Sequence, residues 1–130
     1  MNLFIVFVIS LCGGLGAISR FGCDQIFVPF FQKRLKPNQR IEVATAKSTL
    51  AINCLACFIM GICWISLDSS LQKFFVFGFC GGFSTMSAWA IQLNNLPLVR
   101  AVKYFIYSYV FPLFFALVGA GICVALTWWA

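Results

Sequence analysis

Histidine is absent from the sequence, and acidic residues are nearly absent, since Asp24, Glu42 and Asp68 are the only three in 130 positions. Because the three acids are scattered, no pair of carboxylates is available for general acid–base catalysis. A serine or cysteine nucleophile has no histidine to activate it, and no glycine-rich loop has the spacing that cradles phosphate. These absences exclude most classes of enzyme, and we predict a protein that is not an enzyme.

Charge of either sign is scarce, at 9% of the residues, whereas 62% of the residues are hydrophobic. A soluble domain carries about 25% charged residues, so these few charges cannot cover the surface of so apolar a chain. Lipid must surround most of it. A helix needs about 20 apolar residues to cross a bilayer, and the length therefore allows four spans. We expect an all-α integral membrane protein with one four-span domain over residues 1–130.

The apolar runs predict the positions of the spans, at about residues 2–21, 48–67, 74–93 and 101–129. The first run has no basic segment before it and no convincing cleavage site, so we interpret it as a retained span and not a signal peptide. A polar connection is expected after Phe21. Within it Ile26, Phe27, Phe30 and Phe31 have helical spacing and are predicted to lie at the membrane interface.

Cysteine is abundant but lacks the context of a redox or metal site. The count of seven is odd, and nearly all of the cysteines fall inside apolar runs. Cys54 and Cys57 form a CxxC pair, but no second pair or histidine accompanies it, and it lies within a predicted span. We interpret the cysteines as small packing residues and predict no disulfide.

The basic residues give a net charge of +6, but they flank the apolar spans, where they set topology rather than bind nucleic acid. We predict no nucleic-acid partner. On the terminal side of a four-span chain lies Lys73 alone. The cations on the other side are Arg20, Lys33, Arg34, Lys36, Arg40, Lys47, Arg100 and Lys103. This bias predicts that the first and third connections are cytoplasmic and that both termini lie outside.

Polar side chains within the predicted spans are neutral, and no Asp, Glu, Lys or Arg is expected at mid-membrane depth. Proton-coupled antiport is hard to build from such a set, whereas amide and hydroxyl donors suit a small anion that is partly dehydrated and then released. The alternative is that these groups only hold helices together, and the residues alone leave both interpretations open. The candidates are Asn53, Ser84, Thr85, Ser87, Tyr104, Tyr107 and Ser108.

The third predicted span contains the segment GFCGGFSTMS (78–87), whose glycines and hydroxyl residues lower helix propensity at the centre of the membrane. A break in the helix there would free backbone carbonyls, which need a partner because lipid supplies none. A monovalent cation is one such partner. A serine hydroxyl bonded back to the chain is the other, and composition does not choose between them.

Four blocks of the sequence occur in the order of a known family. They are GGLGAISR (13–20), TLAIN (49–53) followed by Phe58 and Gly61, GFCGGFST (78–85), and the pair Tyr104 and Ser108. Together they resemble the Fluc/CrcB family of fluoride ion channels, or fluoride exporters, from about Ser10 to Gly121.

The resemblance implies a fluoride-selective channel subunit in the cell membrane that lowers cytoplasmic fluoride by passive export. It implies an inverted, antiparallel dimer and a third helix broken at its centre. A structural sodium ion, which is not transported, would be held by the backbone carbonyls of Gly81, Phe83 and Ser84. Arg20 would attract anions or cap nearby carbonyls, or else lie at the interface. The implied fluoride pathway consists of Asn53, Met86, Ser87, Trp89, Tyr104 and Ser108.

The sequence departs from the family pattern where two phenylalanines are usual, because Met86 and Trp89 stand at those places. Threonine is usual where Ser84 stands, and glycine is usual where Ser48 and Ala56 stand. The second subunit is therefore either another copy of this chain or, as we favour, a homologous chain of opposite charge bias. A non-conducting structural partner is the alternative function. A small multidrug antiporter is a distant one, because residues 2–21 lack the acid it needs.

Overall fold

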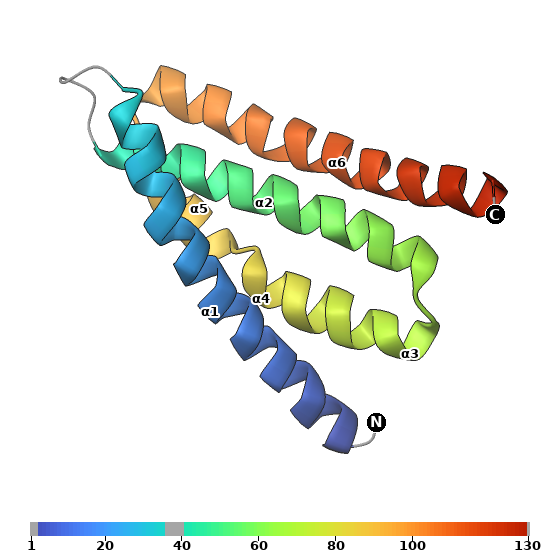
Figure 1. The fold of residues 1–130 in the computed structure, drawn as a ribbon. Helices are drawn as coiled ribbons and strands as arrows, with labels where there is room; N and C mark the ends of the chain where they lie inside the picture. The colour runs from blue at the N-terminus through green and yellow to red at the C-terminus, as the bar shows by residue number, and fades with distance from the viewer. Residues whose placement is uncertain (1–2, 36–40, 130) are drawn as a thin grey trace.

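The computed structural model describes residues 3–35 and 41–129, and all the regular structure in that part of the chain is helical (Figure 1). Four stretches are long and apolar enough to cross a membrane, namely Leu3–Lys33, Ile41–Ser66, Phe74–Asn95 and Leu98–Trp129. The prediction of four apolar helices is confirmed. The elements in order are α1 (Leu3–Lys33), α2 (Ile41–Ser66), α3 (Ser69–Gln72), the π-helical η1 (Lys73–Cys80), α4 (Gly81–Phe83), α5 (Met86–Asn95) and α6 (Leu98–Trp129).

The direction of the chain alternates from one span to the next, so that the end of α1 and the starts of α2 and α6 lie together (Figure 1). The most extensive contact joins α2 to α6, and α1 packs most closely against η1 and to an equal, smaller extent against α2 and α4. The small core between them contains Ile52, Ala56 and Phe83. Many large apolar side chains point away from this core and are exposed, as expected for a surface that lipid or another subunit covers.

The first helix is longer than expected, because α1 continues past Phe21 to Lys33 and includes Pro29. The expected polar connection therefore starts after Lys33, and Ile26, which we had placed in it, lies within the helix. This segment looked polar because of Pro29 and the basic residues from Lys33 onward, but Pro29 lies inside the helix and Lys33 ends it. Lys36 and Arg40 lie outside the described residues.

Close approach of the backbones requires glycine at both helix contacts. A Cβ atom at Gly16 of α1 would overlap the carbonyl oxygen of Phe79, and one at Gly82 would overlap that of Gly13. On the other contact, a Cβ atom at Gly61 of α2 would overlap the carbonyl oxygen of Ala116 in α6. Small residues allow such approach between helices in membranes, where packing replaces the hydrophobic effect.

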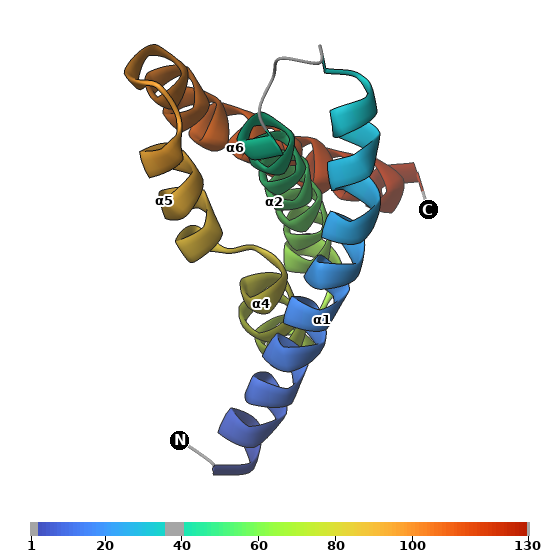
Figure 2. The ribbon, with the colours of Figure 1, turned by 90° about the vertical axis from the view of Figure 1, so that its left-hand side faces the viewer.

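The third apolar stretch leaves helical geometry between α4 and α5 (Figure 2). Ser84 has φ −81° and ψ 152°, and Thr85 has φ −146° and ψ 132°, both in the extended region. The last backbone hydrogen bond before this link runs from the Ser84 N–H to the Cys80 carbonyl, at 2.9 Å. The carbonyls of α4 therefore lack the N–H donors that a continuing helix would have supplied.

Candidate functional site

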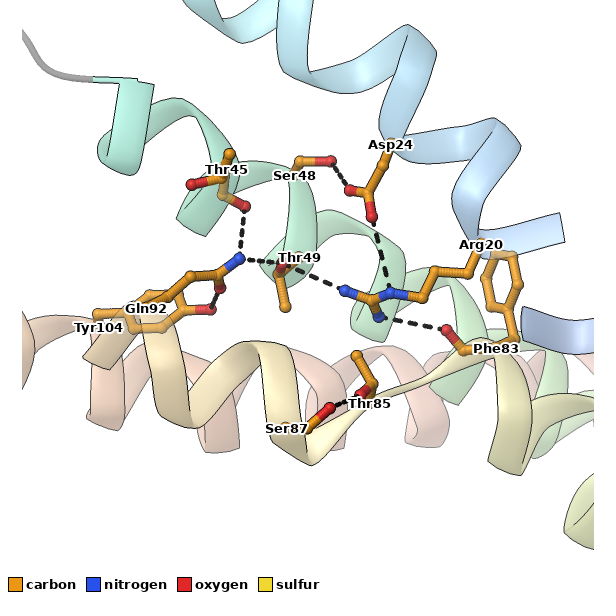
Figure 3. Close-up of polar contacts among 10 residues, drawn as sticks. All are labelled: Arg20, Asp24, Thr45, Ser48, Thr49, Phe83, Thr85, Ser87, Gln92 and Tyr104. Carbon is orange, nitrogen blue, oxygen red and sulfur yellow. Dashed lines mark hydrogen bonds and ion pairs between the residues drawn. The ribbon is translucent and has the colours of Figure 1, made fainter. Parts of the chain in front are cut away.

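A charged side chain lies where α1 meets the centre of the third stretch (Figure 3). Arg20 is 12% exposed, and its guanidinium donates to the Phe83 carbonyl and to Thr49 Oγ1, each at 3.4 Å. It thus caps one of the carbonyls that the link after α4 leaves without a helical partner. Of the roles expected for Arg20, carbonyl capping is the one with a contact in the structure.

Asp24 balances that charge from the same helix. Its Oδ2 lies 3.6 Å from Arg20 Nε, and its Oδ1 accepts a hydrogen bond of 2.6 Å from the hydroxyl of Ser48. Arg20 and Asp24 are thus charged side chains placed between helices, where the other candidates from the sequence were neutral. Pairing along one helical turn and the hydroxyl of Ser48 reduce the cost of placing these charges there.

An amide on α5 continues the polar contacts toward α6. Gln92 Nε2 donates to Thr49 Oγ1 at 2.7 Å and to the Thr45 carbonyl at 3.3 Å. The hydroxyl of Tyr104, which is buried, donates to Gln92 Oε1 at 2.8 Å. We call Arg20, Asp24, Ser48, Thr49, Gln92 and Tyr104 the polar network, which joins α1, α2, α5 and α6 (Figure 3).

Sequence reasoning missed Gln92, although a signal was present. Gln92 lies inside the predicted third span, and an amide in that position needs hydrogen-bonding partners, because lipid provides none. Tyr104 was on the expected fluoride pathway, and the structure places its hydroxyl in the polar network. Thr49 appeared only as part of a family block, yet it accepts hydrogen bonds from both Arg20 and Gln92.

Two residues of the expected pathway each have a buried polar atom without a partner. Among residues 3–35 and 41–129, Oδ1 of Asn53 and Nε1 of Trp89 are fully buried and make no hydrogen bond. The Trp89 ring lies 5.8 Å from that of Phe105 and 6.2 Å from that of Tyr109, measured between centroids. Because most buried polar atoms in proteins are bonded, an unsatisfied one needs an explanation such as an ion or a water molecule.

The other expected pathway residues have local contacts or exposed positions. Ser108 donates to the Tyr104 carbonyl one turn earlier, at 2.7 Å, and Ser87 shares a 3.0 Å hydrogen bond with Thr85. Met86 is 72% exposed. No hydrogen bond joins these side chains to Asn53 in the described residues, so the expected pathway is not a continuous chain of hydrogen bonds within one subunit.

The residues expected to hold a cation follow one another at the end of α4. Gly81 is exposed, Ser84 is partly buried, and Phe83 is buried with its ring stacked 5.7 Å from that of Phe79. Within the described ranges no group of three or more His, Cys, Asp or Glu side chains has the arrangement of a metal site. A cation at this place would bind to backbone oxygens. The carbonyls of α4 lack the N–H donors of a continuing helix, but that of Phe83 already accepts a hydrogen bond from Arg20.

Comparison of the sequence with known proteins identifies its family. The family model described as "CrcB-like protein, Camphor Resistance (CrcB)" matches residues 7–125, which is nearly the whole chain. The chain belongs to the CrcB family. The match covers most of each of the four apolar helices. This CrcB protein is therefore a multi-pass membrane protein.

Several curated relatives of this CrcB protein carry the name "Fluoride-specific ion channel FluC". The one from Azobacteroides pseudotrichonymphae is 31% identical over 108 residues, covering 76% of this chain and 74% of the relative. One from Histophilus somni is 35% identical over 104 residues, covering 74% and 73%. A third, from Francisella philomiragia, is 29% identical over 125 residues, covering 92% and 93%.

Proposed function

We propose that this CrcB protein is a subunit of a fluoride-selective channel through which fluoride passes down its electrochemical gradient. The proposal draws on the names of the relatives and on the chemistry of the buried polar atoms. Fluoride accepts hydrogen bonds and is strongly hydrated, so a pathway must offer donors that replace its water without holding it.

The observation that carries the proposal is the indole N–H of Trp89. This group is a donor only, and it is buried without an acceptor among the described residues. A buried donor left unsatisfied costs about 1–3 kcal/mol, and an anion passing beside it would offset that cost. The –NH₂ group of Asn53 offers two further donors for fluoride, whereas its buried Oδ1 is an acceptor and would not bind the anion.

Passive movement suits this site better than coupled transport. Asp24 is engaged on both oxygens, by Arg20 and by Ser48. The carboxylate of Asp24 therefore serves to balance the charge of Arg20. A proton relay would instead need an acid that gains and loses its proton during transport. Fluoride would then leave a cell whenever its gradient and the membrane potential favour efflux.

For the assembly, we propose an inverted dimer in the plasma membrane, with a structural sodium ion at the carbonyls of Gly81, Phe83 and Ser84. Gly81, which is exposed and whose carbonyl lacks a helical N–H donor, supports this placement, and the carbonyl of Phe83 would be shared with the guanidinium of Arg20. The ion would be a fixed positive charge beside the pathway. A non-conducting partner role is the second candidate, and it is favoured by Met86, which is exposed and has no hydrogen-bond donor where a pathway residue was expected.

The first test is fluoride efflux from proteoliposomes that contain the purified assembly, followed with a fluoride electrode. We expect efflux to start when a potassium ionophore removes the opposing voltage, and chloride efflux to stay at the background of empty liposomes. Efflux that needs a pH gradient, and that the ionophore does not support, would refute a passive channel.

The second test removes the N–H of Trp89 and keeps an aromatic ring, by Trp89→Phe. Because loss of one buried donor is worth about 1–3 kcal/mol, we expect fluoride efflux to fall by roughly one to two orders of magnitude. Trp64→Phe is the matched control, since Trp64 is 55% exposed on α2. Because phenylalanine is usual at this place in the family, efflux unchanged by Trp89→Phe would show that the indole N–H is not a donor on which fluoride depends.

A further inference from the structure

Two adjoining apolar hollows lie along the contact between α2 and α6. The larger has a volume of about 490 Å³ and the smaller about 260 Å³, and Lys47 and Leu50 line both of them. The larger volume is in the range of about 300–1,000 Å³ that is usual for small-ligand sites. Its lining includes Ala51, Leu55, Phe58, Phe111 and Phe115.

Three cations surround the smaller hollow. Lys47, Arg100 and Lys103 all line it, and all three are exposed. Arg100 and Lys103 lie in the first two turns of α6, and Lys47 lies in the second turn of α2, at the end of the bundle where both helices begin (Figure 1). No carboxylate lies within ion-pair distance of these cations in residues 3–35 and 41–129.

We propose that this α2–α6 groove binds an anionic phospholipid, with its phosphate at Lys47, Arg100 and Lys103 and an acyl chain in the larger hollow. Basic pockets between membrane helices bind anionic lipid headgroups. Lysine and arginine side chains near helix ends also reach toward the headgroup layer while their carbon chains stay in apolar surroundings. The proposal depends on the membrane setting and not on fluoride conduction.

Charge distinguishes this occupant from a second copy of the chain. Each copy has only three acidic residues, and Asp24 is already paired with Arg20. A copy seated in the groove would therefore bring little negative charge to three clustered cations. An anionic phospholipid brings a phosphate and an apolar chain on one molecule, which matches both parts of the groove.

The test is native mass spectrometry of the purified assembly with added phosphatidylglycerol or phosphatidylcholine. We expect phosphatidylglycerol to be retained preferentially, and the double variant Lys47→Gln, Lys103→Gln to weaken its binding by roughly tenfold. The matched control is Lys33→Gln with Arg34→Gln, which removes the same number of positive charges near the end of α1 and should leave phosphatidylglycerol binding unchanged. Lys47→Arg with Lys103→Arg keeps the charge and should retain the lipid, even if the glutamine variant does not fold.

The apolar half of the groove has its own variant. Ala51→Phe fills the larger hollow and should reduce retention of phosphatidylglycerol, whereas Ala125→Phe, on the exposed surface of α6, should not. Equal retention of the two lipids by the wild type, or equal phosphatidylglycerol retention by wild type and the glutamine variant, would overturn the proposal. If Ala51→Phe or the glutamine variant changed the number of subunits in the assembly and left lipid retention unchanged, the proposal would be overturned too, because the groove would then be a contact between subunits.

Discussion

Arg20 and Gln92 together show how a membrane protein keeps polar groups at depth. Arg20 has a carbonyl, a hydroxyl and a carboxylate around it, and Gln92 has partners for both its oxygen and its nitrogen. Apart from Asp24, the partners of these two side chains lie far from them in the sequence. The spacing of residues along the chain therefore did not reveal these contacts. Asp24 lies one helical turn from Arg20, so that pairing was the part within reach of sequence reasoning.

Asn53 differs from the polar network in that its side-chain oxygen has no partner among the described residues. We predict that Asn53→Ala lowers fluoride efflux at least tenfold, because the substitution removes the amide donors. The subunits should still assemble, because Oδ1 makes no hydrogen bond to the described part of the chain that the substitution could break. Efflux from proteoliposomes and the elution volume in size-exclusion chromatography measure the two effects.

The matched control is Asn95→Ala, since Asn95 is exposed at the end of α5. This control should keep the wild-type rate. If Asn53→Ala also keeps that rate, the pathway through this subunit is silent and the role of a non-conducting partner is supported.

At the scale of the elements, the block GGLGAISR (13–20) serves helix packing as well as family resemblance. Of its glycines, Gly16 faces the carbonyl of Phe79, whereas Gly14 has open space around the position of a Cβ atom. We predict that Gly16→Ala destabilises the protein by about 1–3 kcal/mol, the usual cost of overpacking, because the obstacle is backbone and cannot move aside as a side chain would.

Gly14→Ala is the matched control and should be neutral or slightly stabilising, since alanine favours the helix over glycine. Thermal unfolding in detergent, followed by tryptophan fluorescence, measures both. If Gly16→Ala melted at the same temperature as the control, the close approach of Gly16 in α1 to the Phe79 carbonyl in η1 would be contradicted.

The number and apolar character of the helices was predictable from the sequence, because the length of an apolar run is set directly by the thickness of the bilayer. The end of α1 was not predictable, because Pro29 and the basic residues from Lys33 onward indicated a loop, whereas the helix includes Pro29 and continues to Lys33. The glycine-rich segment 78–85 indicated weak helix propensity, but it did not indicate that the extended backbone lies at Ser84 and Thr85. Gln92 was missed because its partners, Thr49 and Tyr104, are distant in sequence.

At the scale of the whole molecule, positive charge gathers at one end of the bundle. Lys33 ends α1, and Lys47 and Arg100 lie near the starts of α2 and α6, which meet at that end (Figure 1). Only Lys73 falls on the other side by sequence. Short loops rich in lysine and arginine usually stay in the cytoplasm, and this bias therefore predicts one preferred orientation.

The inverted dimer proposed above needs one subunit in each orientation, and this bias predicts that the lone chain does not supply both in equal amounts. We therefore predict that the lone chain inserts with both termini outside and gives little fluoride efflux, and that a homologous subunit of opposite charge bias restores efflux. Terminal cysteines added at either end, in a background with the seven native cysteines replaced, are labelled in intact cells with a membrane-impermeant thiol reagent. Labelling of about half of the molecules from each side, together with efflux from the lone chain, would instead establish a homodimer with dual topology.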